Sequence, residues 1–227
     1  MRRRLHRSCP AAWLVFLSVS ALMACGTVGA EAPVPLPDPL ADEPVAMSKG
    51  QPTAVFAGGC FWGIEAVFKH VKGVKDVKSG YTGGSAATAH YEIIGSGRTG
   101  HAESVRIIYD RSQITYGQLL KVLFSVAHDP TQLDRQGPDE GSQYRSAVFA
   151  STPDQKRIAD AYISQLNQAR VFKRPIVTAV VSLGTFYEAE DYHQDYVANH
   201  PESLYVRTFD LPKLDNLRKQ FPDLYKR

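Results

Sequence analysis

The residue best suited to do chemistry in this sequence of 227 residues is Cys60. It follows two glycines and precedes Phe61 and Trp62, in the stretch GGCFWG at the end of an apolar run. A helix is expected to begin at or just after Cys60, and the N–H groups at a helix start lower the pKa of a thiol. Phe61 and Trp62 lie off the apolar stripe of that helix, so we expect them to line a pocket. An isolated cysteine in apolar surroundings is otherwise often buried and inert.

Glu103 is the second candidate. It lies in a predicted strand, 101–110, where it alternates onto one face with Val105, Ile107 and Tyr109. Apolar surroundings disfavour the charged form of a carboxyl group, so burial on this face would raise the pKa of Glu103. Such a carboxyl group can act as a general acid near neutral pH. The pattern leaves open a solvated carboxylate at a strand edge.

The elements that must position these residues alternate along a body that we place at residues 53–227. Strands are predicted at 53–59, 73–81, 101–110, 144–151 and 176–184, and helices at 60–71, 115–128 and 153–169. Thr152, Pro153 and Gln155 form a capping-box pattern before the last helix. A long loop is expected at 128–143, and the segment from 186 onward is not assigned. This order predicts an α/β (α+β) fold in two layers, with a mixed sheet, flanking helices, a ferredoxin-like βαβ core and an irregular C-terminal tail.

The first 24 residues differ from the body. Four arginines precede a short apolar run, 11–24, which ends in small residues at Cys25. This is the pattern of a secretory signal peptide, and the letters LMAC resemble the lipobox of bacterial lipoproteins. We expect export to the cell envelope, with cleavage before Cys25 and a lipid anchor on its sulfur. Cleavage after VGA, 28–30, would instead give a soluble periplasmic or secreted protein.

Residues 25–52 contain six prolines and are expected to form an extended tether between the anchor and the body. Removal of the leader takes away four of the 26 basic residues and none of the 23 acidic ones, so the formal charge changes from +3 to −1. No basic surface for nucleic acid is expected from this composition.

Several motifs together resemble those of the peptide methionine sulfoxide reductase A family. They occur in order over 53–200 and are GGCFWGIEAVF, SGYTGG, HYE, GSGRTGHAESVRIIYD, HDPTQLDRQGPDEGSQYRSAVF and FYEAEDYHQDY. The resemblance implies thiol-dependent reduction of the S epimer of methionine sulfoxide, in peptides and free. It implies that Cys60 attacks the sulfoxide sulfur and that Phe61 and Trp62 hold the substrate methyl group.

The same resemblance implies roles for four polar residues. Glu103, in GHAE, matches the acid that protonates the sulfoxide oxygen. Tyr91, in HYE, and Tyr144, in QYR, match phenols that hydrogen-bond this oxygen. Asp139, in GPDEGSQY, matches a carboxylate that organises the polar contacts of the site.

The attack would leave Cys60 as a sulfenic acid. Many family members then use a cysteine near the C-terminus, but this sequence has none after Cys60. Cys9 would leave with the leader, and a lipidated Cys25 would be blocked. We therefore expect recycling by a thioredoxin-like protein or another external thiol, with no metal or bound cofactor, in a monomer. A free Cys25 on a flexible tether of about 35 residues is the alternative.

Two other functions stay open. The first is a cysteine hydrolase or acyltransferase in which Cys60 is paired with a histidine, and its candidates are His101, His128 and His193. The second is a non-catalytic lipoprotein that binds methionine-like side chains at Phe61 and Trp62. The letters GSGRTG match a dinucleotide motif, but a strand pattern follows them where that motif requires a helix.

Overall fold

The computed structural model describes residues 35–44 and 51–226. The predicted leader, 1–24, and Cys25 lie outside these residues. Of the predicted tether, only 35–44 and 51–52 are described. None of the helices that the structure describes is both long enough and apolar enough to span a bilayer.

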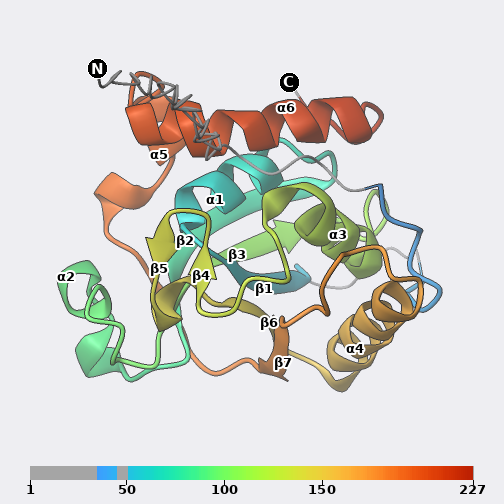
Figure 1. The fold of residues 1–227 in the computed structure, drawn as a ribbon, viewed down its shortest axis with the longest axis horizontal. Coiled ribbons are helices and arrows are strands. Elements are labelled where there is room, and N and C mark those ends of the chain that lie inside the picture. The colour runs from blue at the N-terminus through green and yellow to red at the C-terminus, as the bar shows by residue number, and fades with distance from the viewer. Residues whose placement is uncertain (1–34, 45–50, 227) are drawn as a thin grey trace, which may run out of the picture.

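A six-stranded sheet with the order β7-β6-β1-β3-β2-β8 forms the centre of the domain (Figure 1). Its strands are β1 Thr53–Gly58, β2 Val74–Thr82, β3 Ala102–Tyr109, β6 Ser146–Ala150, β7 Ala179–Ser182 and β8 Phe186–Glu188. Neighbouring strands are antiparallel except β6 and β7, so the predicted mixed sheet is confirmed. Because β3 lies between β1 and β2, the β1-α1-β2 unit is split, as in the predicted ferredoxin-like core.

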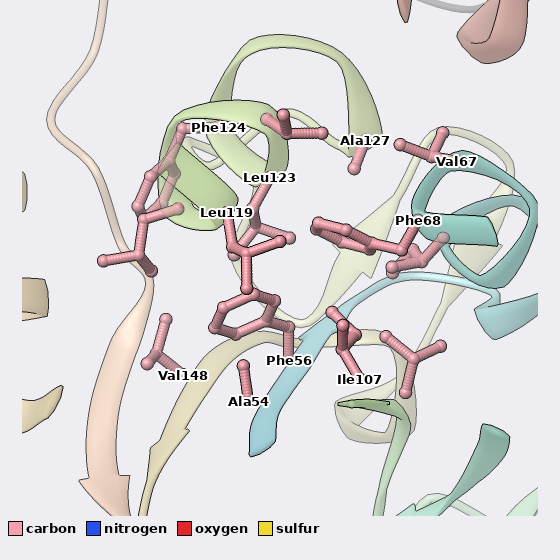
Figure 2. Close-up of a cluster of buried hydrophobic side chains, with 14 of the residues drawn as sticks. Ala54, Phe56, Val67, Phe68, Ile107, Leu119, Leu123, Phe124, Ala127 and Val148 are labelled. Atoms are coloured by element: carbon pink, nitrogen blue, oxygen red, sulfur yellow. The ribbon is translucent and has the colours of Figure 1, made fainter. Parts of the chain in front are cut away.

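Helices cover one face of this sheet and form the second layer. They are α1 Phe61–Lys69, α3 Tyr116–Val122, which continues as a π-helix at Leu123–Ala127, and α4 Pro153–Gln168. Figure 2 shows Phe56 of β1 and Ile107 of β3 facing Phe68 of α1 and Leu119 of α3. A much smaller apolar cluster, which includes Val55, lies on the other face of the sheet. The alternation predicted from the sequence therefore separates the two faces correctly.

The capping box predicted at the start of α4 forms only in part, and a complete one is found at the start of α3. Thr152 Oγ1 accepts a hydrogen bond from the Gln155 N–H at 3.1 Å, as predicted for α4. The Gln155 side chain does not complete a capping box, because its Oε1 accepts from the Ser151 N–H at 2.9 Å instead. A complete capping box begins α3, between Thr115 and Gln118.

Two regions contain more regular structure than predicted. The expected loop at 128–143 contains the hairpin of β4 Arg135–Gln136 and β5 Asp139–Glu140, and a 3-10 turn at Ser142–Tyr144 precedes β6. The expected irregular tail contains α5 Tyr196–Asn199, a π-helix at Val206–Asp210 and α6 Leu211–Gln220; a further short helix, α2 Tyr91–Ile94, precedes β3. Leu217 of α6 is fully buried. An apolar stripe of so few turns gives only a weak helical signal.

Residues 35–44, here called the strap, lie along the body beside α3 and α4 (Figure 1). Leu36 is buried, and the carbonyl of Pro37 accepts a hydrogen bond from Tyr162 at 2.8 Å. Asp42 accepts from the Gly117 N–H at 2.8 Å and Glu43 from the Tyr116 N–H at 3.0 Å, so both carboxylates cap α3. Residues 35–44 of the predicted tether are therefore packed against the body. Cys25 lies outside the described residues, so the alternative in which it reaches Cys60 stays a prediction.

Candidate active site

Cys60 is the N-cap residue of α1 and directly follows β1 and Gly59. Gly59 has φ of +96°, and a Cβ there would collide with Gln136. Glycine therefore permits the sharp turn from strand to helix. The Cys60 side chain is 8% exposed, so the sulfur lies just beneath the surface.

The pKa of the Cys60 thiol is raised well above its ordinary value, opposite to the direction expected from the helix start. Burial is the largest cause, and negative charges on Glu103 and Asp210 add to it. The Trp62 N–H of the first helical turn and the Lys213 ammonium lower the pKa without outweighing these effects. The helix start is where we predicted it, but the resting cysteine is a protonated thiol.

Glu103 of β3 lies beside this cysteine. Its side chain is 3% exposed, and Oε2 accepts a hydrogen bond from the N–H of Phe61, the next residue after Cys60, at 3.1 Å. Burial raises the pKa of Glu103 to about 8, although the hydrogen bond from Phe61 opposes this and the charge of Asp139 adds to it. The strand pattern predicted this burial and this direction, and both are confirmed. Glu103 is therefore protonated at neutral pH.

Three further predicted residues gather around Cys60 and Glu103. They are Tyr91 of α2, Asp139 of β5 and Tyr144 of the following turn. Burial raises the pKa of both phenols, and the negative charges of Glu103 and Asp139 and a thiolate at Cys60 raise it further. Such interactions require proximity, so the structure brings these five side chains into one site.

Tyr205 belongs to the same site, although no sequence motif marks it. Its hydroxyl donates a hydrogen bond to Asp139, and its ring meets the Trp62 ring edge-on, with 5.9 Å between centroids. Burial and a negative charge at Cys60 raise the pKa of Tyr205. It lies in the segment left unassigned from the sequence, between Leu204 and Val206, where no periodic pattern marks a single tyrosine.

Phe61 and Trp62 do not share one environment. Phe61 is 1% exposed and packs in the main core against Tyr81 of β2, with 5.7 Å between centroids. The expectation that Phe61 lies outside the core is therefore wrong. Trp62 is half-buried and stacks on Tyr196, with 3.6 Å between centroids. Of the two rings, that of Trp62 is the one presented at the surface.

An ion pair from the C-terminal segment also approaches Cys60. Lys213 Nζ lies 3.2 Å from Asp210 Oδ1, and the Asp210 side chain is completely buried. A Cβ on Gly63 would collide with both side chains, so this glycine lets the pair approach the first turn of α1. The pair acts on the Cys60 pKa with opposite signs. No local pattern marks the pair as part of the site, because Asp210 and Lys213 reach Cys60 only when the C-terminal segment packs on α1.

The three histidines give Cys60 no partner within the part of the chain that the structure describes. His128 bonds Leu123 and Ser146, at 3.1 and 2.7 Å, and burial lowers its pKa to about 4. His101 bonds the backbone of Gly84 and Ser85, and His193 bonds Trp62. A hydrolase needs a base within hydrogen-bond reach of the nucleophile. The described residues also contain no group of acidic, histidine and cysteine side chains arranged to hold a metal ion.

Comparison with known proteins agrees with this geometry. The family model described as peptide methionine sulfoxide reductase matches residues 52–225. A Synechocystis protein named peptide methionine sulfoxide reductase MsrA 2 is 54% identical over 193 residues, which cover 84% of this chain and 90% of that protein. A protein of the same name from Mesorhizobium japonicum is 58% identical over 176 residues, or 78% and 90% of the two chains.

The solved structure of methionine sulfoxide reductase A from Corynebacterium diphtheriae has the same fold. It is 34% identical, with a TM-score of 0.59, and the match covers 78% of this chain and 88% of that one. The matched region includes the strands and helices that place Cys60 beside Glu103. The chain therefore belongs to the peptide methionine sulfoxide reductase family of oxidoreductases.

Proposed function

We propose that the protein reduces the S epimer of methionine sulfoxide to methionine, in proteins and peptides and as the free amino acid. The observation that most strongly supports this is the buried, protonated carboxyl group of Glu103 beside the thiol of Cys60. Sulfoxide sulfur is a poor electrophile until its oxygen is protonated or strongly hydrogen-bonded. A neutral carboxyl group next to a thiol supplies both parts that the reaction needs.

In the proposed reaction, the Cys60 sulfur attacks the sulfoxide sulfur while Glu103 protonates the oxygen. Tyr91 and Tyr144 are neutral phenols at neutral pH, since their pKa values are raised, and they donate hydrogen bonds to the same oxygen. The oxygen then passes to the Cys60 sulfur, which becomes a sulfenic acid. The sulfoxide sulfur gains two electrons, the cysteine sulfur loses two, and methionine leaves. The proton that the thiol loses restores the one that Glu103 has given to the oxygen, so the carboxyl group ends the step protonated.

The thiol must lose its proton to attack, and the surroundings of Cys60 oppose this less when Glu103 is neutral. An ionised Glu103 raises the pKa of Cys60, whereas a protonated one does not repel the thiolate. The Trp62 N–H and the Lys213 ammonium then stabilise the developing negative charge. Asp139, hydrogen-bonded by Tyr205, holds the polar side of the site in place.

An external reductant returns Cys60 from the sulfenic acid to the thiol. Many family members use a cysteine near the C-terminus for this, but Cys60 is the last of the three cysteines in this sequence. A thiol of this reductant condenses with the sulfenic acid, which releases water and leaves a mixed disulfide. A second thiol of the same reductant then releases Cys60. A thioredoxin-like protein, with two such thiols, is the partner that we propose.

We also propose that the protein acts in the cell envelope, where it repairs oxidised proteins. The arginine-rich apolar leader and the letters LMAC support export and a lipid on Cys25. Cleavage after residue 30 is the alternative. The mass of the mature protein distinguishes the two, because a lipid adds to the mass of a chain that starts at Cys25.

The experiment is incubation of the full chain with racemic methionine sulfoxide and dithiothreitol, followed by separation of the two epimers. We expect loss of the S epimer only, abolished in Cys60→Ser and retained in Cys25→Ser. Turnover near the wild-type rate in Cys60→Ser would refute the assignment. Ester or amide cleavage without any reductant would favour the hydrolase instead.

A further inference from the structure

His193 is a buried residue that the proposed reaction does not use. His193 is the last residue of the 3-10 turn Asp191–His193, and it is 1% exposed. Its ring lies among aromatic rings of the site, with centroid distances of 4.3 Å to Tyr91, 5.1 Å to Phe61 and 5.8 Å to Trp62. A polar ring enclosed by these side chains requires an explanation.

The hydrogen bond from Trp62 fixes the state of this ring. Trp62 Nε1 donates to His193 Nδ1 at 3.1 Å. An indole N–H can only donate, so Nδ1 must be without a proton. The neutral imidazole then has its proton on Nε2, which is buried and has no hydrogen-bond partner among the described residues. The bond to Trp62 therefore exists only while His193 is neutral.

Other contacts of Trp62 do not fix its orientation in the same way. The indole stacks on Tyr196 with an angle of 6° between the rings and meets Tyr205 edge-on. Stacked rings can slide or rotate in their shared plane at little cost. A hydrogen bond has a direction, so the contact with His193 determines how the indole is turned within that plane.

We infer that His193 is the positioning residue of Trp62: its neutral ring accepts the indole N–H and holds the indole in place, and protonation of the ring releases it. The inference rests on the proposed function and on the role that the family resemblance implies for Trp62, which is to hold the substrate methyl group. Its consequence is weaker substrate binding in acid, while the chemistry at Cys60 is little changed.

His193 changes its charge in mildly acidic solution, whereas the groups that face it do not. Burial lowers the pKa of His193, and the negative charge of Glu190 opposes this. Hydrogen bonds to Glu190, including one from the Tyr91 N–H, keep its own pKa lowered despite partial burial, so it stays ionised. Burial raises the pKa of Tyr91 and Tyr192, which stay neutral. From helix α1, the rings of Phe61 and Trp62 face His193, and neither ring carries a charge.

Tryptophan fluorescence tests this directly. The sequence contains two tryptophans, Trp13 and Trp62, so Trp13→Phe in the full chain leaves Trp62 as the only emitter. We expect its emission to titrate once in mild acid, with a midpoint below the ordinary histidine value of about 6.5. Glu103 titrates at about 8 and is separated from this step. A flat emission from pH 7 down to the onset of acid unfolding overturns the inference.

The variants His193→Asn and His193→Leu form a matched pair of nearly equal size. Asn places an oxygen acceptor close to the position of Nδ1, whereas Leu offers none. In both, the acid titration of Trp62 emission should disappear. At neutral pH the KM for a sulfoxide peptide should rise about five- to tenfold in the Leu variant and stay within about twofold in the Asn variant. The single-turnover rate at saturating substrate should change less than about twofold in both.

Equal KM values for the two variants, or an acid titration that survives in the Leu variant, contradict the inference. The fluorescence arm needs no turnover, so it still decides the role of His193 if the proposed reaction fails. A wild-type KM that rises in acid with the same midpoint as the emission supports the link between the two.

Discussion

The substitution Glu103→Gln removes the ionisable carboxyl group beside Cys60 and keeps the size and shape of the side chain nearly unchanged. A glutamine oxygen can still accept the hydrogen bond that the Phe61 N–H donates at 3.1 Å to Glu103. The variant has no proton to give at this position and no negative charge beside Cys60. It therefore tests separately whether Glu103 is an acid, whether it is protonated in the folded protein, and whether it repels a thiolate.

The stability effect follows from the pKa of Glu103, which changes from an ordinary value of 4.5 to about 8 on folding. Between these values the folded protein retains a proton that the unfolded chain has lost, so stability falls as pH rises. Integration gives a loss of about 1 kcal/mol at pH 5, about 3 kcal/mol at pH 7 and close to 5 kcal/mol above pH 8. The glutamine variant escapes this loss and should be the more stable protein by about these amounts.

Two reactivities should change in opposite directions in Glu103→Gln. Single-turnover reduction of a sulfoxide peptide should slow by about 10²-fold, the usual scale for a missing general acid. Alkylation of Cys60 by iodoacetamide at pH 8 to 9 should become faster, because the negative charge that raises the Cys60 pKa is gone. A variant that was merely misfolded would not produce this combination.

Urea unfolding at pH 5 and pH 7 measures the stability difference, and rapid-quench kinetics measure the single turnover. Glu140→Gln is the control, since Glu140 is an exposed carboxylate on β5 and the change in chemistry is the same. If Glu103→Gln and the wild type lose equal stability between pH 5 and pH 7, Glu103 is not held protonated by the fold. An unchanged single-turnover rate would remove Glu103 from the role of acid.

Two further predictions concern Lys213 and the strap. Lys213→Met should slow iodoacetamide alkylation of Cys60 at pH 8 to 9, because the ammonium lowers the thiol pKa, and Lys213→Arg should restore most of the rate; equal rates in all three proteins would contradict the role of this charge. Asp42→Ala should lower the free energy of unfolding by about 1 kcal/mol, the usual cost of a lost helix cap, when measured by urea unfolding. Asp38→Ala, which removes an exposed ion pair with Lys121, should change it by less than about 0.5 kcal/mol, and equal losses in the two would show that capping is not what holds the strap.

Most of the central fold follows from local pattern. Strands β1, β2, β3 and β6 alternate or form short apolar runs, and α1, α3 and α4 have helical stripes with Thr115 and Thr152 at their starts. The strap and α6 were not predictable in this way. The strap has no secondary structure, and it stays in place through Asp42 and Glu43 at the N-terminus of α3, which is a tertiary contact.

The site residues also separate into those that a local pattern reveals and those that only tertiary packing brings together. Cys60 and Glu103 could be found because each has a local signature, a helix start for one and an alternating strand for the other. Tyr205, Asp210 and Lys213 lie some 150 residues further along the chain, and only the packing of the C-terminal segment brings them to Cys60. The charge state of Cys60 was predicted wrongly because a helix start is a local feature, whereas burial depends on everything packed around the sulfur.

A protonated resting thiol suits an enzyme whose proposed nucleophile is exposed to oxidants between reactions. Susceptibility of a cysteine to peroxides follows its thiolate character and its exposure, and over-oxidation beyond the sulfenic acid is irreversible for most proteins. Cys60 is buried and its pKa is raised, so in the absence of substrate it offers little thiolate to such oxidants. In the proposed reaction, neutral Glu103 donates a hydrogen bond to the sulfoxide oxygen and adds no negative charge that would raise the Cys60 pKa. In that reaction the same protonated carboxyl group therefore serves both the cysteine and the sulfoxide.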